Sequence, residues 1–354
     1  MAILRERALH ERGLVTGRFF RVSRRWMLIG AIFGIGVLVG WTLDGYFVTQ
    51  PVAEFFRPVR EQGASYQFIN PLLTFDSAES DNIASFREIK QLLQTHISED
   101  IAVGRATSIS VYFRGVQSGR WVGVNVDEKY SPASLLKVPT MMAFFKLAEE
   151  NPNILSRRIA YQGNYDDDKI QYFKPATPLQ AGSYTIEALM RRMVELSDNV
   201  ALRLLRENIP PAVLEKVYLD LGLPNPDTQE ILGSMSVTEY SYFFRTLFNA
   251  TYLNRRFSEQ ALGLLHETQF ILGIRTGVPK NVPVATKFAE RIVVARDGRT
   301  VQSIELHDCG IVYYPKHPYL LCVMTRGGNI QMLSNVIGDL SRVAYNERAK
   351  QFPQ

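Results

Sequence analysis

Cysteine and histidine are scarce in this chain. Its 354 residues include 2 cysteines and 5 histidines. The cysteines fit no zinc-binding pattern, and the histidines show neither H-x-H nor H-E-x-x-H spacing. The sequence therefore predicts neither a metal site nor a cofactor. The histidines concerned are His10, His96, His266, His307 and His317.

Internal repeats and low-complexity tracts are also missing. Apolar residues make up 46% and charged residues 21% of the sequence, which is typical of an ordinary globular protein. The formal net charge of +5 is mild, and much of it comes from seven arginines within residues 1–25. A basic arm of this kind suggests nucleic-acid binding, but no nucleic-acid-binding motif occurs elsewhere in the chain.

Residues 26–43 form an uncharged apolar run, WMLIGAIFGIGVLVGWTL. Its length is at the short end of what spans a bilayer as a helix. Arginines before an apolar span keep the N-terminus in the cytoplasm and export the rest, so the basic tail is better explained as a topology signal. A cleaved signal peptide is the main alternative, but no small-x-small cleavage site follows the run. We therefore expect a single-pass anchor in the cytoplasmic membrane, an extracytoplasmic domain and no nucleic-acid partner.

Two glycine pairs in this run have the G-x-x-x-G spacing that lets membrane helices pack closely. Dimerisation through Gly30 and Gly34, or through Gly36 and Gly40, would use that spacing. Glycines are common in membrane spans, so the spacing by itself does not establish a dimer.

The chain after the anchor divides into a tether and one domain. Residues 44–80 show no sustained periodicity and are interpreted as a tether, although the apolar stretch around Phe68 could pack on the domain. Residues 81–354 show a helix, two strands, a block of helices, three or four strands and a final helix. Residues 151–184, within the helical block, are expected to be rich in loops, and the first two of the later strands are expected at 282–288 and 292–295. This order predicts an α+β domain, in which terminal helices flank an antiparallel sheet and an all-helical subdomain is inserted.

Ser134 and Lys137 lie three residues apart where an apolar helical pattern begins. On a helix, positions i and i+3 share one face, so the lysine amine can reach the serine hydroxyl. A lysine whose pKa is lowered by burial or by a nearby cation can take the serine proton and create a nucleophile. The alternative is a helix start with a surface lysine, since S-x-x-K also occurs by chance.

Cys309 and Cys322 flank a hairpin whose turn we place at Pro315 and Lys316. The two cysteines then face each other across neighbouring strands. Both a cross-strand disulfide, which would suit an exported domain, and a pair of buried thiols agree with the sequence.

Two further motifs extend the Ser134 pattern into a family resemblance. Ser197, Asp198 and Asn199 form an intact S-D-N between two expected helices, and Lys287 stands where a K-T-G motif would follow. From about residue 85 onward, the chain resembles the class A β-lactamases and the penicillin-binding D,D-peptidases, whose signatures are S-x-x-K, S-D-N and K-T-G. The resemblance implies a β-lactamase/transpeptidase-like fold and a serine hydrolase that forms an acyl-enzyme.

The resemblance assigns a role to each matched residue. Ser134 is the nucleophile, Lys137 is the base that acts directly or through water, and Ser197 relays a proton to the leaving nitrogen. Asn199 holds a substrate amide and contacts Lys137, whereas Asp198 is a buried structural residue.

Two further positions are assigned by the resemblance. Lys287 raises the local positive potential, which helps dock a substrate carboxylate and depresses the pKa of Lys137. The backbone N–H groups of Ser134 and Glu290 form the oxyanion hole.

The K-T-G match is degenerate, because Phe288 and Ala289 replace the threonine and the glycine. Phenylalanine cannot supply the hydroxyl that helps bind a carboxylate. If a carboxylate is still bound, Arg291 or Thr286 would have to contribute.

The loop that carries the deacylating glutamate of class A β-lactamases is short here and lacks E-x-x-L-N. Glu230 or Asp227 could serve as that base, or both could be ordinary loop acids. Without such a base, deacylation should be slow, and the protein would behave more like a penicillin-binding peptidase.

The substrates implied by the resemblance are β-lactams or D-Ala-D-Ala cell-wall peptides, between which the sequence does not decide. A D,D-peptidase of cell-wall metabolism is one alternative. A non-catalytic descendant that binds peptidoglycan is the other. The intact Ser134, Lys137, Ser197 and Asn199 favour an enzyme, because binding alone does not require an activated serine.

Overall fold

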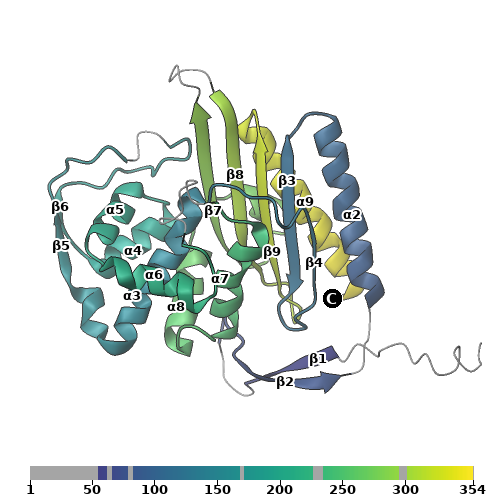
Figure 1. Ribbon diagram of the computed structural model, residues 1–354, viewed down its shortest axis with the longest axis horizontal. Helices are drawn as coiled ribbons and strands as arrows, with labels where there is room; N and C mark the ends of the chain where they lie inside the picture. Colours follow the sequence, from purple (N-terminus) through teal and green to yellow (C-terminus); the bar gives the residue numbers. More distant parts are fainter. Residues whose placement is uncertain are drawn as a thin grey trace, which may run out of the picture. The chain divides into compact units, whose positions relative to one another are not determined.

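A five-stranded antiparallel sheet, with strand order β4-β3-β9-β8-β7, organises the domain (Figure 1). The early strand β3 pairs with the last strand, β9, so distant parts of the sequence complete one sheet. The strands are β3 (Ser108–Gly115), β4 (Trp121–Val124), β7 (Val284–Val294), β8 (Val301–Val312) and β9 (Tyr319–Gly327).

This computed structural model describes residues 55–61, 66–78, 83–167, 171–225, 234–294 and 301–353. The basic tail, the apolar run 26–43 with its glycine pairs, and the loop acids Asp227 and Glu230 lie outside these ranges. Within them, no helix combines the length and the apolarity needed to cross a bilayer.

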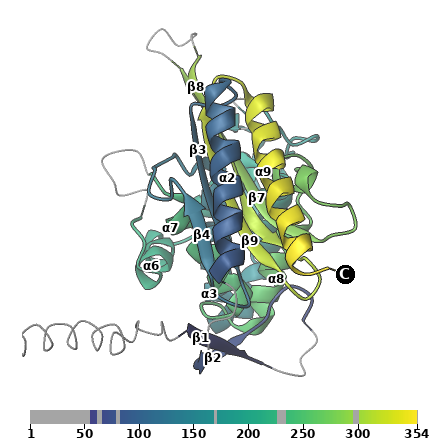
Figure 2. The same cartoon turned by 90° about the vertical axis from the view of Figure 1, so that its right-hand side faces the viewer.

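Helices α2 (Ile83–Ala102) and α9 (Ile330–Gln351) lie side by side on one face of the sheet (Figure 2). Helix α9 begins at the cap residue Asn329, whose side chain accepts a hydrogen bond from the backbone N–H of Met332. Its apolar side chains at helical spacing are completely buried against the sheet. They include Leu333, Val336, Ile337 and Leu340.

A block of helices covers the other face and is inserted between β4 and β7. Its central helix, α3, is buried on nearly every side, which explains its continuous apolar sequence. The block comprises α3 (Lys137–Glu150), α4 (Ile186–Glu195), α5 (Asn199–Glu207), α6 (Pro211–Asp220), α7 (Val237–Asn249) and α8 (Arg255–His266). The expected α+β architecture with terminal helices and a helical insertion is confirmed.

Some local features differ from the expectations. The stretch interpreted as a tether contains a hairpin, β1 (Phe55–Arg60) paired with β2 (Leu72–Ala78). Between these strands, Phe68 is buried against His266 and Tyr313, which agrees with the expectation that this apolar stretch packs on the domain.

The region expected to be a loop between α3 and α4 contains a two-stranded sheet, β5 (Arg158–Tyr161) and β6 (Gly182–Thr185). The two strands expected at 282–288 and 292–295 are one strand, β7, with an irregularity between Val293 and Val294. Such short or interrupted elements have weak sequence patterns, since their pairing depends on neighbours that are distant in the chain.

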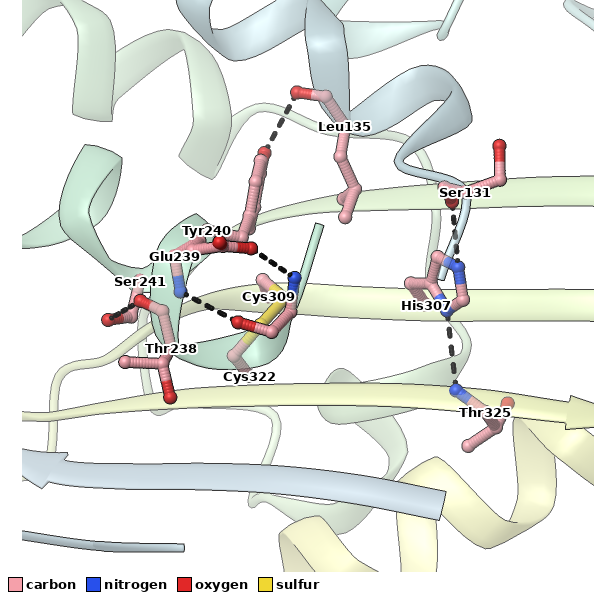
Figure 3. The surroundings of a disulfide bond; sticks show 11 residues. Ser131, Leu135, Thr238, Glu239, Tyr240, Ser241, His307, Cys309, Cys322 and Thr325 are labelled. Carbon is pink, nitrogen blue, oxygen red and sulfur yellow. Dashed lines mark hydrogen bonds between the residues drawn. A yellow bond between two sulfur atoms is a disulfide. The ribbon is translucent and has the colours of Figure 1, made fainter. Parts of the chain in front are cut away.

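Cys309 on β8 and Cys322 on β9 are direct cross-strand partners and form a disulfide (Figure 3). The structure thus selects one of the two states that the sequence left open. Both residues are completely buried in the core beneath α7. The bond closes the hairpin whose turn contains Lys316 in a left-handed conformation.

Loss of this disulfide should destabilise the domain markedly. The cysteines are separated by 13 positions, and cross-linking a loop of about 15 residues stabilises a protein by about 3 kcal/mol through the unfolded chain. We expect the double variant Cys309→Ala/Cys322→Ala to lose about that much free energy of unfolding in urea titrations. Reductant should lower the stability of the wild type but not that of the variant. Equal stability of the two proteins without reductant would contradict the prediction.

Candidate active site

Ser134 lies in a 3₁₀ turn, η1 (Ala133–Leu136), directly before α3. The preceding residue, Ala133, has a left-handed φ of 42°, which is uncommon outside glycine. This turn is held in place from β8. Glu305 accepts a hydrogen bond from the backbone N–H of Ser131 (3.0 Å), and His307 Nε2 lies 3.0 Å from the Ser131 carbonyl oxygen (Figure 3).

The two contacts of the His307 ring determine which of its nitrogens carries the proton. Its Nδ1 accepts from the backbone N–H of Thr325 (3.3 Å), so in the neutral ring Nε2 carries the proton and donates to Ser131. Burial lowers the pKa of His307 to about 4. The ring is therefore neutral near pH 7 and serves as a fixed donor that positions the Ser134 turn.

Lys137 is the first residue of α3 and is completely buried. Its Nζ lies 2.9 Å from Ser134 Oγ, 3.0 Å from Ser197 Oγ, 2.6 Å from the Ser197 carbonyl oxygen and 2.7 Å from Asn199 Oδ1. These acceptors outnumber the three protons of an ammonium group. The amine is thus fixed at the centre of the site and in contact with all three polar residues that the motifs predicted.

The S-D-N segment forms the turn between α4 and α5. Ser197 has a left-handed φ of 55°, which directs the chain from one helix into the next. Asp198 caps α5 by accepting from the Ala201 N–H (2.7 Å), and it pairs with Arg192. Asp198 is completely buried, as expected of a structural residue.

Lys287 approaches Ser197 from the opposite side, on β7. Its Nζ donates to Ser197 Oγ and to the Phe288 carbonyl oxygen, both at 2.9 Å. The Ser197 hydroxyl therefore lies between two lysine amines. Burial, reinforced by the charge of Lys137, shifts the pKa of Lys287 well below its ordinary value.

Glu290, three residues further along β7, is bound to a loop. Its Oε1 accepts from the backbone N–H groups of Tyr172 (2.7 Å) and Phe173 (3.0 Å), whereas Oε2 has no hydrogen-bond partner. Burial raises the pKa of this carboxyl group. The family resemblance assigned a role only to the backbone N–H of Glu290. The contacts of its side chain with the loop were not expected from the sequence.

A cleft of about 620 Å³ opens at Ser134. It brings Ser134, Asn199, Glu290 and Arg291 together, whereas Lys137, Ser197 and Lys287 are buried around it. Arg291 Nη1 donates to Ser131 Oγ (2.7 Å). The lining residues are Ala133, Ser134, Gln171, Asn199, Leu202, Glu290, Arg291, Ile292 and Val294.

Sequence reasoning missed Gln171. Its Nε2 donates to the Ser197 carbonyl oxygen (2.9 Å), so a residue in a loop contacts the central turn of the site. No motif or periodicity marks this position. Thr286, considered as a substitute carboxylate donor, is completely buried and does not line the cleft.

Comparison with known proteins identifies a family for this chain. The family model described as "Beta-lactamase enzyme family" matches residues 89–348. No curated protein sequence matches the chain significantly.

Solved structures of three related proteins share the fold. A variant of PBP-A, whose structure is an acyl-enzyme complex with penicillin G, is 19% identical, with a TM-score of 0.61 over 75% of this chain and 97% of that chain. A class A β-lactamase from Mycobacterium abscessus is 21% identical, with a TM-score of 0.60 over 74% and 99%. A β-lactamase from Xanthomonas campestris pv. campestris is 16% identical, with a TM-score of 0.61 over 73% and 98%.

Sequence identities this low establish a shared fold but do not establish an activity. The family model, however, covers well over half of the sequence, and its range includes all three motifs. The chain belongs to the β-lactamase enzyme family.

Proposed function

We propose that this protein is a serine hydrolase that forms an acyl-enzyme at Ser134, acting on β-lactams or on D-Ala-D-Ala cell-wall peptides. The observation that carries the proposal is the distance of 2.9 Å between Lys137 Nζ and Ser134 Oγ, in a site where a second buried lysine approaches the same serine network. Two neighbouring ammonium charges repel each other, which favours one neutral amine. In the proposed reactive form Lys137 is the amine that has lost its proton, because a general base requires a free lone pair.

In the acylation step, Lys137 takes the Ser134 proton as Oγ attacks the substrate carbonyl carbon. The tetrahedral oxyanion is stabilised by the backbone N–H groups of Ser134 and Glu290, and such a donor contributes about 3–4 kcal/mol to transition-state stability. The proton then passes from Lys137 to Ser197 Oγ, 3.0 Å away, while Ser197 gives its own proton to the leaving nitrogen. The carbon–nitrogen bond breaks and leaves an ester at Ser134.

Lys287 keeps the Ser197 hydroxyl oriented through its contact of 2.9 Å. Asn199 lines the cleft, so its amide can hold a substrate amide while its Oδ1 accepts from Lys137 (2.7 Å). These two residues position the reacting groups, which is the main contribution that a rigid site makes before any charge develops.

Release of the acyl group is the slower half of the proposed reaction. Among the described residues that line the cleft, Glu290 is the only acid, and its carboxylate is bound to two loop amides. Glu230 stays a candidate for the water-activating base. If deacylation of the penicillin adduct is slow, the protein is better described as a penicillin-binding D,D-peptidase than as an efficient β-lactamase, and this is the alternative that we propose.

We further propose that residues 26–43 anchor the chain in the cytoplasmic membrane with the domain outside it. The apolar run and the arginines before it support this topology. A cell-wall substrate would be accessible only from that side. Dimerisation through Gly30/Gly34 or Gly36/Gly40 is compatible with such an anchor.

Intact-mass measurement of the full-length chain with benzylpenicillin tests the proposed function. We expect a mass gain of one penicillin per chain, located on the peptide that contains Ser134, and persistence of the adduct because deacylation is slow. Ser131→Ala is the matched control, since it removes a neighbouring hydroxyl that contacts Arg291 and should leave the adduct intact. An adduct that also forms on Ser134→Ala, or no adduct at all, would contradict the proposal.

A further inference from the structure

The cleft at Ser134 has an apolar side formed by residues that take no part in the proposed proton transfers. Leu202 on α5 and both Ile292 and Val294 on β7 line the cleft together with Ser134. Ile292 is 39% exposed and Val294 is 47% exposed, so two branched aliphatic side chains meet solvent there. Single exposed apolar residues are ordinary, but three that line one cleft beside a reactive serine indicate a binding surface.

Strand β7 orders its two apolar residues by the alternation of its side chains. Side chains two positions apart point to the same face of a strand, so Ile292 and Val294 follow Glu290 along the face that borders the cleft. At about 3.3 Å per residue, they lie about 7 and 13 Å beyond Glu290. The intervening Arg291 is held by Ser131 Oγ (2.7 Å). The strand thus carries a row of aliphatic side chains away from the backbone N–H of Glu290.

Helix α5 supplies Leu202 from the same face as Asn199. Positions three apart share one face of a helix, and Asn199 Oδ1 accepts from Lys137 (2.7 Å). Asp198 caps the start of this helix and is paired with Arg192, so the orientation of α5 is fixed. Leu202 is therefore presented to the cleft by a rigid element, which suits a binding residue.

The proposed reaction decides which part of a substrate meets these apolar side chains. In that reaction Ser197 protonates the leaving atom, and Lys287, earlier on β7, donates to Ser197 Oγ (2.9 Å). The carbonyl oxygen of the substrate lies at the backbone N–H of Glu290, which comes between Lys287 and Ile292 on the strand. The leaving group thus occupies the Lys287 end of β7, and the acyl group extends toward Ile292 and Val294.

We propose that Leu202, Ile292 and Val294 form a subsite for an aliphatic or aromatic group on the acyl side of the substrate. This inference rests on the proposed function and specifies its substrate class. Benzylpenicillin carries a phenyl ring on that side, and a D-Ala-D-Ala peptide presents the methyl group of its penultimate D-alanine and the side chain of the residue before it. Covering the three apolar side chains removes their surface from water, which is favourable whatever charge the acyl group carries elsewhere.

A series of 6-acylaminopenicillanic acids, from acetyl to hexanoyl, tests the subsite, because its members share the leaving group and differ only in methylenes on the acyl side. The rate of adduct formation on the full-length chain is measured by intact mass at low penicillin concentration and divided by the rate of hydrolysis by hydroxide. We expect this corrected rate to rise about twofold for each added methylene, less than complete burial gives, because the cleft is open on one side. A corrected rate that stays constant or falls from acetyl to hexanoyl would overturn the inference.

The double variant Ile292→Thr/Val294→Thr should flatten this series. Threonine keeps the β-branched shape that suits a strand but replaces apolar surface by a hydroxyl. We expect the ratio of the hexanoyl rate to the acetyl rate to fall about threefold or more, since part of the apolar contact is lost. The matched control is Ile101→Thr on α2, the same residue type at the same exposed fraction of 39% but outside the cleft, and it should keep the wild-type ratio.

An unchanged ratio in the folded double variant would also overturn the inference. If that variant does not fold, Leu202→Gln takes its place, because glutamine is compatible with a helix and removes the apolar contact from α5. We expect it to lower the same ratio, and an unchanged ratio in Leu202→Gln would overturn the inference as well.

Failure of the proposed function gives a different result. If no member of the series labels Ser134, or if Ser134→Ala is labelled equally, the acyl-enzyme mechanism is wrong and the subsite falls with it. Labelling that depends on Ser134 but does not rise with the length of the acyl chain overturns the subsite alone.

Discussion

Replacing Lys137 by methionine is expected to slow the acylation of Ser134 by about 10²- to 10⁴-fold, the usual contribution of a general base. Methionine retains much of the length and apolar volume of the lysine stem but has no amine. Ser134 Oγ would lose its partner at 2.9 Å, and Ser197 would lose its proton donor at 3.0 Å. The measurement is the rate of penicillin adduct formation at saturating penicillin.

Lys146→Met on the same helix is the matched control. Lys146 pairs with Glu149 (2.7 Å) and donates to the Tyr252 carbonyl oxygen (3.0 Å), away from the Ser134 cleft. We expect its acylation rate to stay close to that of the wild type. If Lys137→Met acylated as fast as Lys146→Met, Lys137 would not be the base.

The wild-type protein is expected to lose stability as pH rises from 4 to 8, and Asp308→Asn is expected to remove most of this loss. Asp308 is completely buried on β8, where Oδ2 accepts from the Ile274 N–H (3.0 Å). Burial raises its pKa from 3.8 to about 7, an effect only partly offset by this hydrogen bond, by the charges of Arg275 and Lys287 and by the side chain of Thr286. The folded state therefore binds the Asp308 proton more tightly than the unfolded chain does.

The direction in which stability changes with pH follows from this difference in proton binding. The stability gained from protonated Asp308 is complete below pH 3.8 and is lost as pH rises through about 7. A shift of about three units corresponds to about 4 kcal/mol in the free energy of unfolding. Urea titrations from pH 4 to 8 should show this decline for the wild type and a much flatter profile for Asp308→Asn.

Asp339→Asn provides the contrast. Asp339 pairs with Arg105 (2.7 Å) and Arg342 (2.8 Å), and these contacts hold its pKa below the ordinary value. Its contribution to stability is present above the ordinary pKa and is lost only as pH falls below it. The variant should keep the wild-type decline between pH 5 and 8. A wild-type profile without that decline would show that Asp308 is charged in the folded protein.

The fold was predictable from the sequence where patterns are local and long. The buried face of α9 repeats at helical spacing, and the strands β8 and β9 are joined by a short turn at Lys316. The separate expectations for the two parts of β7 were wrong, because the polar residues Glu290 and Arg291 interrupt the apolar pattern. Both residues line the Ser134 cleft, and Glu290 also binds the loop at Tyr172, so their polarity is required by the site and not by the core.

The candidate site was predictable only in part. Ser134 and Lys137 are three positions apart, so helical geometry alone placed the amine near the hydroxyl. Gln171 was missed because its contact with Ser197 spans 26 positions and leaves no local pattern. The role of Asp227 or Glu230 stays a prediction, because both residues lie outside the described ranges.

The sequence by itself determined which residues can react, since S-x-x-K, S-D-N and the strand lysine are chemical identities at fixed spacing. The tertiary structure alone decided that the Ser197 hydroxyl lies between the amines of Lys137 and Lys287, which are 150 positions apart. It also decided that Phe288 stacks on Phe270 and closes the side of Lys287. Such relations arise when the sheet and the helical block pack together, and the burial they create sets the protonation and the access of each group.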